Sequence, residues 1–441
     1  MRTVVIVGAD FSPSSLPSAL RPRLFAQHLP AFGWHPIVVT TDPRHYERSI
    51  DPENDRLLPK DLEIIRTSAL PARALRRIGI GDVGMRSVWH YWLAVSQLCR
   101  TRRIDALLIS VPPHVPSVVG PLVRRRFGVP YVVDYQDPWI TNYYWKLPRS
   151  ERPGGHKWLL AHTLARCLEP VALSAVSHVT AVSQGTIEQV VGRYPWLRKV
   201  PTTEIPFGGE AGDFEYLRSH PRRNPIFDPH DGCAHVTYTG VCPPAMRETL
   251  RALLGAVDRG RRENPGPFED LRLHFVGTTY AAQAEGAYTV LPLAREAGVA
   301  DLVDERPARV PYLDALQIML DSHALLLIGS EEAHYTASKV FPYILARRPL
   351  LAVVHRASSV VDILCRTGAG EVVSYGAEDP AGQHQGEIAA RLARLLRSLS
   401  AEPAAIRWDA FEGLTARAMA GRLAAVLDAA VHAQPGARGA T

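Results

Sequence analysis

Polar side chains that could bind a ligand follow two apolar segments in the first third of the chain. The apolar run at 106–111 is followed, after two prolines, by His114, and the run at 131–133 is followed by Asp134 and Asp137. Strands of an open parallel sheet end at a shared edge, and ligands bind in the crevice beyond that edge. An imidazole there can hydrogen-bond a sugar hydroxyl, and carboxylates can bind hydroxyl groups or act as a base. We therefore predict a binding crevice that contains these three side chains.

Each of these residues also has a plainer interpretation. His114 can be an exposed histidine of a loop that Pro112 and Pro113 stiffen. Asp134 directly follows the apolar run, which favours a structural role. Asp137 precedes a proline, and an aspartate there fits a turn that its side chain caps as well as it fits catalysis.

A third candidate loop follows the first apolar run, at 3–8. Gly8 would let the backbone approach a ligand and leave amides free for an anion, and Asp10 lies in the same loop. The segment GADFSP lacks the GxGxxG fingerprint of dinucleotide-binding proteins. An ordinary turn from strand to loop explains the segment equally well.

The second half of the chain places small residues and a lysine before a predicted helix. The candidates in this segment are Glu331, Glu332, Thr336, Ala337, Ser338 and Lys339. Free amides and the dipole at a helix start would hold a diphosphate, to which Lys339 would add charge. Gly240, after a strand at 235–239, and Arg247 beyond it are expected to complete this anion site. An ordinary capped helix with surface cations accounts for the same residues.

The sequence lacks the motifs of three other kinds of active site. No Asp-x-Asp triplet occurs, which argues against a divalent metal ion held by paired carboxylates, and we expect neither a metal nor another cofactor. The sequence also lacks a serine nucleophile elbow and a P-loop lysine motif.

Two series of alternating strands and helices are needed to position these groups. Near-continuous apolar strands in such an alternation indicate parallel sheets that helices cover on both faces. The expected strands of the first series lie at 3–8, 36–40, 63–66, 106–111, 131–133 and 179–182, with helices at 19–32, 86–103, 156–177 and 185–192. The expected strands of the second lie at 235–239, 271–276, 302–303, 324–328, 350–354 and 371–374, with helices at 245–264, 283–297, 312–322, 338–347, 358–367, 388–399 and 410–433.

The segment between the series, at 208–233, is rich in Gly, Pro, Asp and Arg, which is typical of a domain boundary. We therefore predict an α/β protein of two doubly wound, Rossmann-like domains that face each other across a cleft. The first would span 1–207 and the second 234–410, with 208–233 as a linker and a final helix with a frayed tail at 411–441.

Composition limits the partners and the compartment. A net charge of +6 over 441 residues is small, and we expect no nucleic-acid partner. The five cysteines form no CxxC pair, and no apolar stretch is long enough to span a bilayer, so we expect a cytoplasmic protein. Basic clusters are either solvated faces or a weak hold on anionic lipid at the inner face of the membrane; they are Arg73, Arg76 and Arg77, then Arg100, Arg102 and Arg103, and Arg124, Arg125 and Arg126.

These motifs together resemble the bacterial glycosyltransferases of family 4, of the retaining GT-B type, along nearly the full length of the chain. Five segments carry the resemblance, in order: VVIVGADFSPSSLPSALRPRLFAQHLPAFGWHPIVVTT; SVPPH followed by DYQDPW; LEPVALSAVSHVTAVSQ; VTYTGV with LHFVGT; and SKVFPYILARRPLLAVV. The order and spacing of the five make the resemblance specific.

The resemblance assigns roles to residues of both domains. It implies that the amides of 336–338 hold the phosphates of a nucleotide-sugar and that Arg247 and Lys339 neutralise them. His114 resembles the histidine that contacts the donor sugar near its anomeric centre, and the loop after Gly8 would approach the diphosphate or the acceptor. The resemblance also implies that the final helix crosses back onto the first domain.

One departure from the family concerns the donor ribose. Family members commonly carry two glutamates, separated by seven residues (E-x7-E), around the phosphate loop, and the second often binds the ribose. The corresponding positions here are His334 and Pro342, neither of which can accept a hydrogen bond as a carboxylate does. Glu331 or Glu332 could substitute from the preceding loop.

The resulting expectation is a retaining glycosyltransferase that moves a sugar from a nucleotide diphosphate sugar to a hydroxyl acceptor. The acceptor would be a glycan, a lipid-linked molecule or a small molecule, as in polysaccharide or glycoconjugate assembly. Two alternatives remain: a nucleotide-sugar epimerase of the same fold, and a non-catalytic relative that binds sugars or a partner enzyme.

Overall fold

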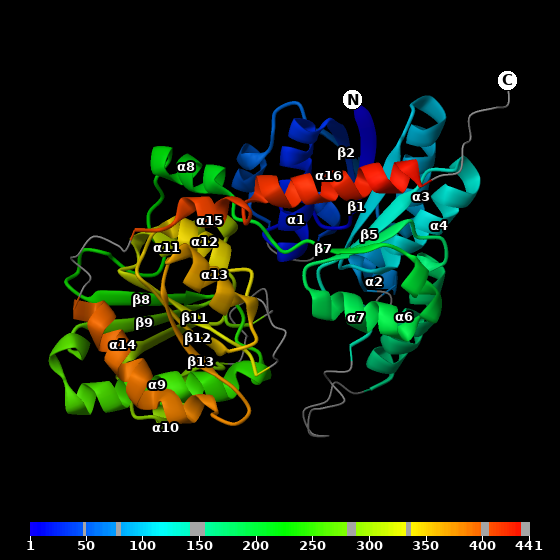
Figure 1. Ribbon diagram of the computed structural model, residues 1–441. Helices are drawn as coiled ribbons and strands as arrows, with labels where there is room; N and C mark the ends of the chain where they lie inside the picture. Colours follow the sequence, from blue (N-terminus) through cyan, green and yellow to red (C-terminus); the bar gives the residue numbers. More distant parts are fainter. Residues whose placement is uncertain are drawn as a thin grey trace. The chain divides into compact units, whose positions relative to one another are not determined.

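The computed structural model divides the chain into two compact units (Figure 1). The first comprises Met1–Phe207 together with Ala416–Thr441, and the second comprises Gly208–Thr415. The residues that the structure describes are 1–46, 50–75, 81–141, 155–279, 288–331, 337–397 and 405–433.

A parallel sheet of seven strands forms the centre of the first unit, within the described residues. Its spatial order is β3-β2-β1-β4-β5-β6-β7. The strands are β1 (Arg2–Gly8), β2 (Trp34–Thr41), β3 (Glu63–Thr67), β4 (Ala106–Val111), β5 (Tyr131–Tyr135), β6 (His178–Ala181) and β7 (Thr202–Glu204). Side chains of a strand alternate between the faces of its sheet. In β1, Val5 and Val7 accordingly enter one apolar core while Val4 and Ile6 enter the other.

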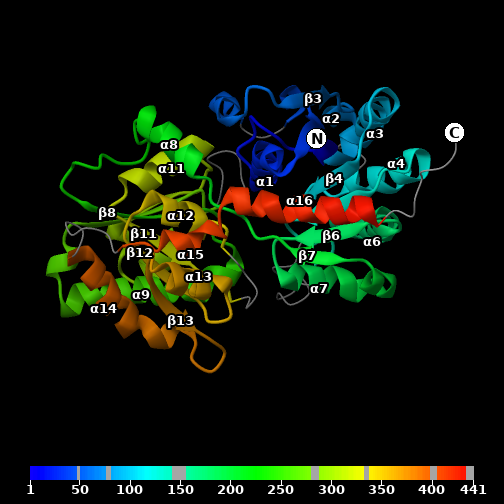
Figure 2. The same cartoon turned by 45° about the horizontal axis from the view of Figure 1, so that its top comes forward.

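Helices cover both faces of this sheet, as the apolar strands require. One face carries α1 (Pro17–His28) and α16 (Ala416–His432), which lie against each other (Figures 1 and 2). The other carries α3 (Val83–Thr101), α4 (Val119–Phe127), α6 (His156–Leu173) and α7 (Gln184–Arg193). The short helix α2 (Ala72–Leu75) precedes α3. The final helix therefore returns to the first domain, as the resemblance implies.

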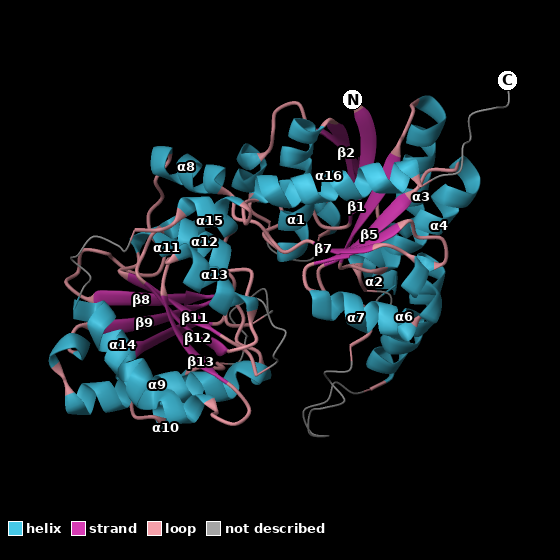
Figure 3. Cartoon of the chain, in the orientation of Figure 1, coloured by secondary structure: helices cyan, strands magenta, loops and turns pink. Residues whose placement is uncertain are grey.

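The second unit is built on a parallel sheet of six strands among the described residues. Their order is β10-β9-β8-β11-β12-β13. The strands are β8 (Ala234–Thr239), β9 (Leu271–Val276), β10 (Val303–Arg306), β11 (Ala324–Ile328), β12 (Leu350–His355) and β13 (Glu371–Tyr375). The core on one face is formed with α9 (Arg247–Glu263), α10 (Leu291–Glu296) and α14 (Gln385–Arg397). The remaining helices are α8 (Ala211–Ser219), α11 (Tyr312–Asp321), α12 (Val340–Ala346), α13 (Ser359–Thr367) and α15 (Trp408–Glu412) (Figure 3).

The two doubly wound sheets confirm the predicted fold class, and several elements differ from their predicted bounds. The segment 208–233, predicted as a linker, belongs to the second unit and contains α8, which packs against α11 and α12. The helix predicted at 410–433 is divided into α15 and α16. Of the helix predicted at 283–297, the described part is only α10; residues 283–287 lie outside the described residues. Strand β7 was not predicted.

A buried ion pair between Arg21 of α1 and Asp134 of β5 joins the elements of the first unit. Both side chains are fully buried, and two hydrogen bonds connect them, Nε to Oδ2 at 2.7 Å and Nη2 to Oδ1 at 2.8 Å. Hydroxyl groups of Thr180 (β6) and Ser110 (β4) donate to the same carboxylate at 2.7 and 3.2 Å. Arg21 also donates to the carbonyl oxygen of Ile205 at 2.8 Å. One carboxylate thus fixes three strands, a helix and the segment that leaves the domain.

We expect that Asp134→Asn or Arg21→Met lowers the free energy of unfolding by about 3–5 kcal/mol, because either change leaves the other buried charge without its partner. The urea midpoint, followed by circular dichroism, measures the effect. Arg2→Met is the matched control, since the Arg2–Asp428 pair is exposed by 38% and 46% on its two side chains and should contribute about 1 kcal/mol or less. Equal losses in the buried and the exposed pair would contradict the assigned role of the Arg21–Asp134 pair.

Candidate active site

His114 lies at the end of β4 and has one ring nitrogen available to a ligand. Its ring stacks on Trp139, with centroids 5.4 Å apart and planes 15° from parallel. Nε2 lies 2.9 Å from the carbonyl oxygen of Asp137. A carbonyl oxygen only accepts, so Nε2 carries the proton, and in the neutral ring Nδ1 is an acceptor. Burial lowers the pKa of His114 to about 4, so the ring is neutral at physiological pH and can accept a hydrogen bond from a hydroxyl group.

Local packing fixes the loop that carries His114. The backbone N–H of Ser117 donates to the carbonyl of His114 at 2.9 Å, and the Ser117 hydroxyl donates to the same oxygen at 2.6 Å. The start of α3 lies directly against this loop. A Cβ on Gly84 would come within 2.7 Å of the Pro113 side chain, so this position accepts only glycine without a shift of the loop.

A second buried carboxylate holds the loop after β5, which carries Asp137 and Trp139. Glu169 of α6 is fully buried and pairs with Arg193 at 3.1 Å. Arg193 also donates to the carbonyl of Ile140 at 2.9 Å. Asp137 itself keeps an exposed side chain beside His114. It remains a candidate for contact with a substrate hydroxyl.

Asp134 is not available to a ligand, and its predicted contact with substrate is wrong. The sequence suggested that the strand ends before Asp134, whereas β5 continues to Tyr135. The carboxylate lies inside the sheet with 0% of its surface exposed, and Arg21, Ser110 and Thr180 occupy its oxygens. The structural interpretation of this aspartate is the correct one.

The loop after Gly8 is held by a tyrosine that sequence reasoning missed. The hydroxyl of Tyr46 accepts the backbone N–H of Phe11 at 3.1 Å. Asp10 is only 9% exposed and accepts a hydrogen bond from Ser18 at 2.9 Å. Gly8 pairs with Ser110 at the end of β1, and a Cβ on Gly8 would make only ordinary contacts, at 3.4 Å or more. Packing within the chain therefore does not require glycine at this position.

Lys339 directly precedes α12, and its side chain lies beside the carboxyl end of β8 in the second sheet. Its Nζ donates to the Tyr238 hydroxyl at 2.5 Å and lies 3.8 Å from the centre of the Tyr238 ring. Burial lowers the pKa of Lys339 to about 7, and the nearby positive charge of Arg309 acts in the same direction. Gly240 has φ of +126°, and a Cβ there would come within 2.7 Å of Nζ. The positive φ favours glycine at 240, and the absence of a Cβ leaves room for the end of the Lys339 side chain.

The helix start that follows Lys339 is only partly described. Ala337 is buried and Ser338 exposed, while Glu332, His334 and Thr336 lie outside the described residues. The hydroxyl of Tyr343 in α12 accepts the backbone N–H of Thr239 at 2.9 Å, which ties α12 to β8. Pro342 is the third residue of α12, where it fits the first helical turn.

Glu331 lies at the start of α9 rather than free in a loop. Its backbone N–H donates to the carbonyl of Ala245 at 2.8 Å, and its carboxylate accepts the backbone N–H of Glu248. Arg247, the first residue of α9, is exposed, and its charge lies close enough to act on Glu331. A carboxylate of the chain itself therefore occupies part of this helix start.

Arg309 is the cation of this edge that sequence reasoning missed. It follows β10 in the segment RPARVPY, where two prolines bracket it. The backbone of Arg309 passes Gly277, whose added Cβ would lie 3.7 Å from the Arg309 Cα. The signal in the sequence was a basic residue soon after a strand end, which is a weak signal because most arginines of a soluble protein lie on its surface.

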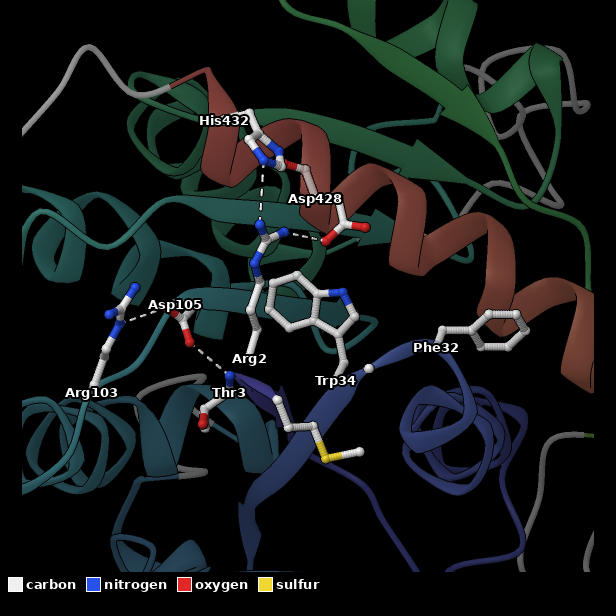
Figure 4. Close-up of a pocket in the computed structure, with 10 residues that line it drawn as sticks. Arg2, Thr3, Phe32, Trp34, Arg103, Asp105, Asp428 and His432 are labelled. Atoms are coloured by element: carbon white, nitrogen blue, oxygen red, sulfur yellow. Dashed lines mark hydrogen bonds and ion pairs between the residues drawn. The ribbon is translucent and has the colours of Figure 1, made fainter.

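A pocket at the opposite edge of the first sheet has its charges paired internally (Figure 4). Arg2 pairs with Asp428 of α16 at 2.5 Å, and Arg103 pairs with Asp105 at 2.9 Å. Asp105 also accepts the backbone N–H of Thr3 at 2.8 Å. These contacts fasten the start of β1 to its neighbours. Among the described residues, no group of three or more His, Cys, Asp or Glu side chains could hold a metal ion.

Comparisons with known proteins agree with this architecture. The profile of the family described as "Glycosyl transferase 4-like domain" matches residues 19–208. The first domain is a glycosyl transferase 4-like domain, and the two parallel sheets of the chain have the GT-B fold. The resemblance to family 4 glycosyltransferases is thereby confirmed. No curated protein sequence matches the chain.

Solved structures similar to this glycosyltransferase cover nearly its whole length. The UDP-forming α,α-trehalose-phosphate synthase of Burkholderia xenovorans, in complex with glucose-6-phosphate, is 10% identical with a TM-score of 0.59, covering 97% of this chain and 100% of that one. Anabaena HepE in complex with UDP-glucose is 13% identical with a TM-score of 0.56, covering 97% and 100%. A glycosyltransferase from Rickettsia africae is 10% identical with a TM-score of 0.56, covering 98% and 99%. At such identities the likeness shows the fold alone.

The altered pKa of Lys339 in the glycosyltransferase predicts an unusual reactivity. We expect its acetylation to reach half its maximal rate near pH 7, because burial disfavours the charged ammonium. Competitive labelling over a pH series, read by mass spectrometry, gives this midpoint, with the exposed Lys60 and Lys199 as references in the same sample. A midpoint near the ordinary lysine value of about 10.4 would contradict the prediction.

Proposed function

We propose that this glycosyltransferase moves a sugar from a nucleoside diphosphate sugar to a hydroxyl acceptor, with retention at the anomeric carbon. The observation that carries the proposal is the environment of Lys339. Among the described residues no carboxylate pairs with this half-buried lysine, whose hydrogen-bond partner is the neutral Tyr238 hydroxyl. Burying a charge without a partner is costly. A diphosphate would supply the missing negative charge.

The second sheet edge suits the leaving group of such a transfer. Negative charge grows on the diphosphate as the bond to the sugar breaks, and cations already in place stabilise that charge without reorganisation. Lys339 and Arg309 lie close enough to affect each other's charge, and Arg247 is exposed at the start of α9. These residues would let the reaction proceed without a metal ion or another cofactor.

The first sheet edge suits the sugar and the acceptor. The neutral ring of His114 would accept a hydrogen bond at Nδ1 from a sugar hydroxyl near the anomeric centre. Asp134, a candidate base in the sequence, is paired with Arg21, and the predicted carboxylates that remain at this edge are Asp10, which accepts a hydrogen bond from Ser18, and the exposed Asp137. Retention without a strong protein nucleophile agrees with this arrangement. Asp137 and the loop after Gly8 would contact the acceptor.

The setting of the reaction is inferred from the family and from neighbours of the same fold. The HepE structure contains UDP-glucose and the trehalose-phosphate synthase is named as UDP-forming. By analogy we infer a UDP- or GDP-sugar donor and a glycan, lipid-linked or small-molecule acceptor, in polysaccharide or glycoconjugate assembly at the cytoplasmic side. No helix within the described ranges is long and apolar enough to cross a membrane.

The missing carboxylates favour one competing function, a non-catalytic binding protein. Pro342 occupies the position of the family's ribose-binding glutamate, and Glu331, the proposed substitute, accepts the N–H of Glu248 instead. The donor ribose must then be bound by other groups. Calorimetry with UDP and with GDP separates the two functions, since binding of neither nucleotide would favour the non-catalytic protein.

We expect Arg247→Ala and Lys339→Ala each to lower turnover by about 10²–10³-fold, because each removes positive charge from the departing diphosphate. The donor is first identified by a thermal-shift screen of nucleotide-sugars, and release of the nucleoside diphosphate then gives the rate. Lys199→Ala, on an exposed 3₁₀ segment of the first unit, is the matched control. A variant with wild-type turnover would exclude its residue from the site, and donor conversion without acceptor would indicate an epimerase.

The affinity for a nucleoside diphosphate should also depend on pH. The free-state pKa of Lys339 is about 7, so above pH 7 the ammonium is lost before binding, and the bound diphosphate must recover the proton. We expect the Kd for UDP or GDP to rise by up to about tenfold per pH unit above 7. In Lys339→Arg this rise should disappear, because arginine stays charged. An equal rise in both proteins would assign the pH dependence to another group.

A further inference from the structure

A row of aspartate and histidine side chains crosses three neighbouring strands of the second unit. The strands β10, β9 and β8 lie in this order in the sheet, and Figure 1 shows β8 beside β9. Asp304 of β10 is directly opposite His274 of β9 in the register, and His235 lies near the start of β8. Asp231, which precedes β8, extends the row by its contact with His235. We call these four residues the Asp–His–His–Asp chain.

Each member of the Asp–His–His–Asp chain is in contact with the next. Nε2 of His235 lies 2.9 Å from Oδ1 of Asp231 and 3.0 Å from the carbonyl oxygen of Asp228. Nδ1 of His235 lies 2.9 Å from Nε2 of His274, whose Nδ1 lies 3.5 Å from Oδ2 of Asp304. No other partner of this last nitrogen is found among the described residues. The two histidines are only 1% and 5% exposed, so their ring nitrogens depend on partners within the chain.

Two neutral rings carry too few protons for the three contacts of the chain. The carboxylate and the carbonyl beside Nε2 of His235 only accept, so Nε2 is protonated, and in a neutral ring Nδ1 is then bare. Nε2 of His274 must donate to it, which leaves Nδ1 of a neutral His274 bare and opposite the Asp304 carboxylate. The other tautomer of His274 instead sets two bare nitrogens 2.9 Å apart. A third proton, which makes one ring an imidazolium, satisfies all three contacts.

The ends of the chain and the ring above it suit a positive charge. A backbone hydrogen bond lowers the pKa of Asp231, and a hydrogen bond from His274 lowers the pKa of Asp304, so both ends are carboxylates at neutral pH. Phe227 stacks on both imidazoles, with its centroid 4.2 Å from that of His235 and 4.6 Å from that of His274. The face of an aromatic ring attracts a cation. An imidazolium here would lie between two carboxylates and against an aromatic face.

Other ionisable groups around the chain are of both signs and do not supply the missing proton. Nδ1 of His323 accepts the backbone N–H of His235 at 3.1 Å, and burial lowers the pKa of His323, so this third ring is neutral. Arg306 pairs with Asp304 at 3.0 Å. The remaining charged and titratable groups beside the chain are His230, Cys233, Asp270, Arg272, Asp321 and Arg348.

We propose that the Asp–His–His–Asp chain is a proton-binding site that holds the segment before β8 on the second sheet. The bound proton makes one ring an imidazolium and is shared by His235 and His274 across their 2.9 Å contact. Phe227 and Asp231 belong to the segment that leads from α8 into β8, and both contact these rings. Loss of the proton removes one contact of the chain, so the segment and the three strands open more easily at higher pH. The site is independent of sugar transfer.

The sign of the pH dependence follows from the proton count. In the opened protein the imidazoles are ordinary and half protonated at about pH 6.5. Above that pH the closed chain binds one more proton than the open one, so each pH unit raises the opening constant by up to about tenfold, until the closed chain also releases the proton. Lys339 acts with the opposite sign, because burial lowers its pKa to about 7 and opening would raise it. Comparing proteins that all keep Lys339 isolates the chain.

Asp304→Asn tests the proposal because it changes the proton count of the chain and little of its shape. The asparagine N–H₂ can donate to the bare Nδ1 of His274, so two neutral rings then satisfy the chain. The matched controls are Asp301→Asn, in an exposed pair with Arg261, and Arg306→Gln, which keeps the Asp304 carboxylate. Native-state hydrogen exchange of peptides from β8, β9 and β10, corrected for intrinsic exchange, gives the opening constants between about pH 6.5 and 8.

We expect the opening constant of the wild type to rise with pH by up to about tenfold per unit more than that of Asp304→Asn. Both controls should rise in parallel with the wild type. Equal rises in the wild type and in Asp304→Asn would overturn the proposal.

Nitrogen NMR of the histidine rings counts the protons directly in the wild-type protein. At about pH 7.5 an ordinary imidazole is mostly neutral. We expect His235 and His274 together to show three protonated nitrogens, and only two in Asp304→Asn. Two protonated nitrogens in the wild type would overturn the proposal whether or not the variant folds.

Discussion

The ion pair between Arg21 and Asp134 is the interaction on which the first domain depends. Removing two charges from water is costly, and only close pairing with further hydrogen bonds offsets that cost. Here the carboxylate accepts from Arg21, Ser110 and Thr180, and the guanidinium reaches the carbonyl of Ile205. The same guanidinium lies over the Phe25 ring. Since each partner comes from a different element, the pair can form only when helix, strands and domain exit are all in place.

This constraint links the fold to the candidate site. Ser110 is the penultimate residue of the strand that leads to His114, and Asp134 belongs to the strand that leads to Asp137. The buried pair therefore fixes the positions at which the two loops leave the sheet. A second buried carboxylate, Glu169, then holds the later of these loops through Arg193. The loops of the candidate site are thus positioned by buried charges that are not themselves accessible to a ligand.

The sequence supported the fold better than the site. Apolar strands are local signals, and β4, β9 and β11 have the bounds that their apolar runs predict. Asp134 was wrongly predicted to contact the substrate because its partner Arg21 lies 113 residues away in the sequence. No local sequence pattern indicates that the two residues pair. Gly240 was predicted as part of the site, but its positive φ and its proximity to a lysine side chain 99 residues later could not be predicted from spacing. Whether a polar residue is structural depends on partners that are distant in the sequence, and the spacing of residues along the chain does not reveal these partners.

The partners of each charge therefore decide which predicted residues can act on a ligand. The carboxylate of Asp134 accepts hydrogen bonds from an arginine and two hydroxyl groups, and the carboxylate of Glu331 accepts a hydrogen bond from a backbone amide of α9. Nε2 of His114 is paired with a carbonyl oxygen, which leaves Nδ1 to a ligand. Among the described residues, Lys339 contacts the neutral hydroxyl and the ring face of Tyr238. A half-buried cation without a carboxylate among the described residues is unfavourable in the free protein, and burial lowers the pKa of Lys339 to about 7. In the proposed function, the diphosphate of the donor would provide the negative charge that no described carboxylate provides.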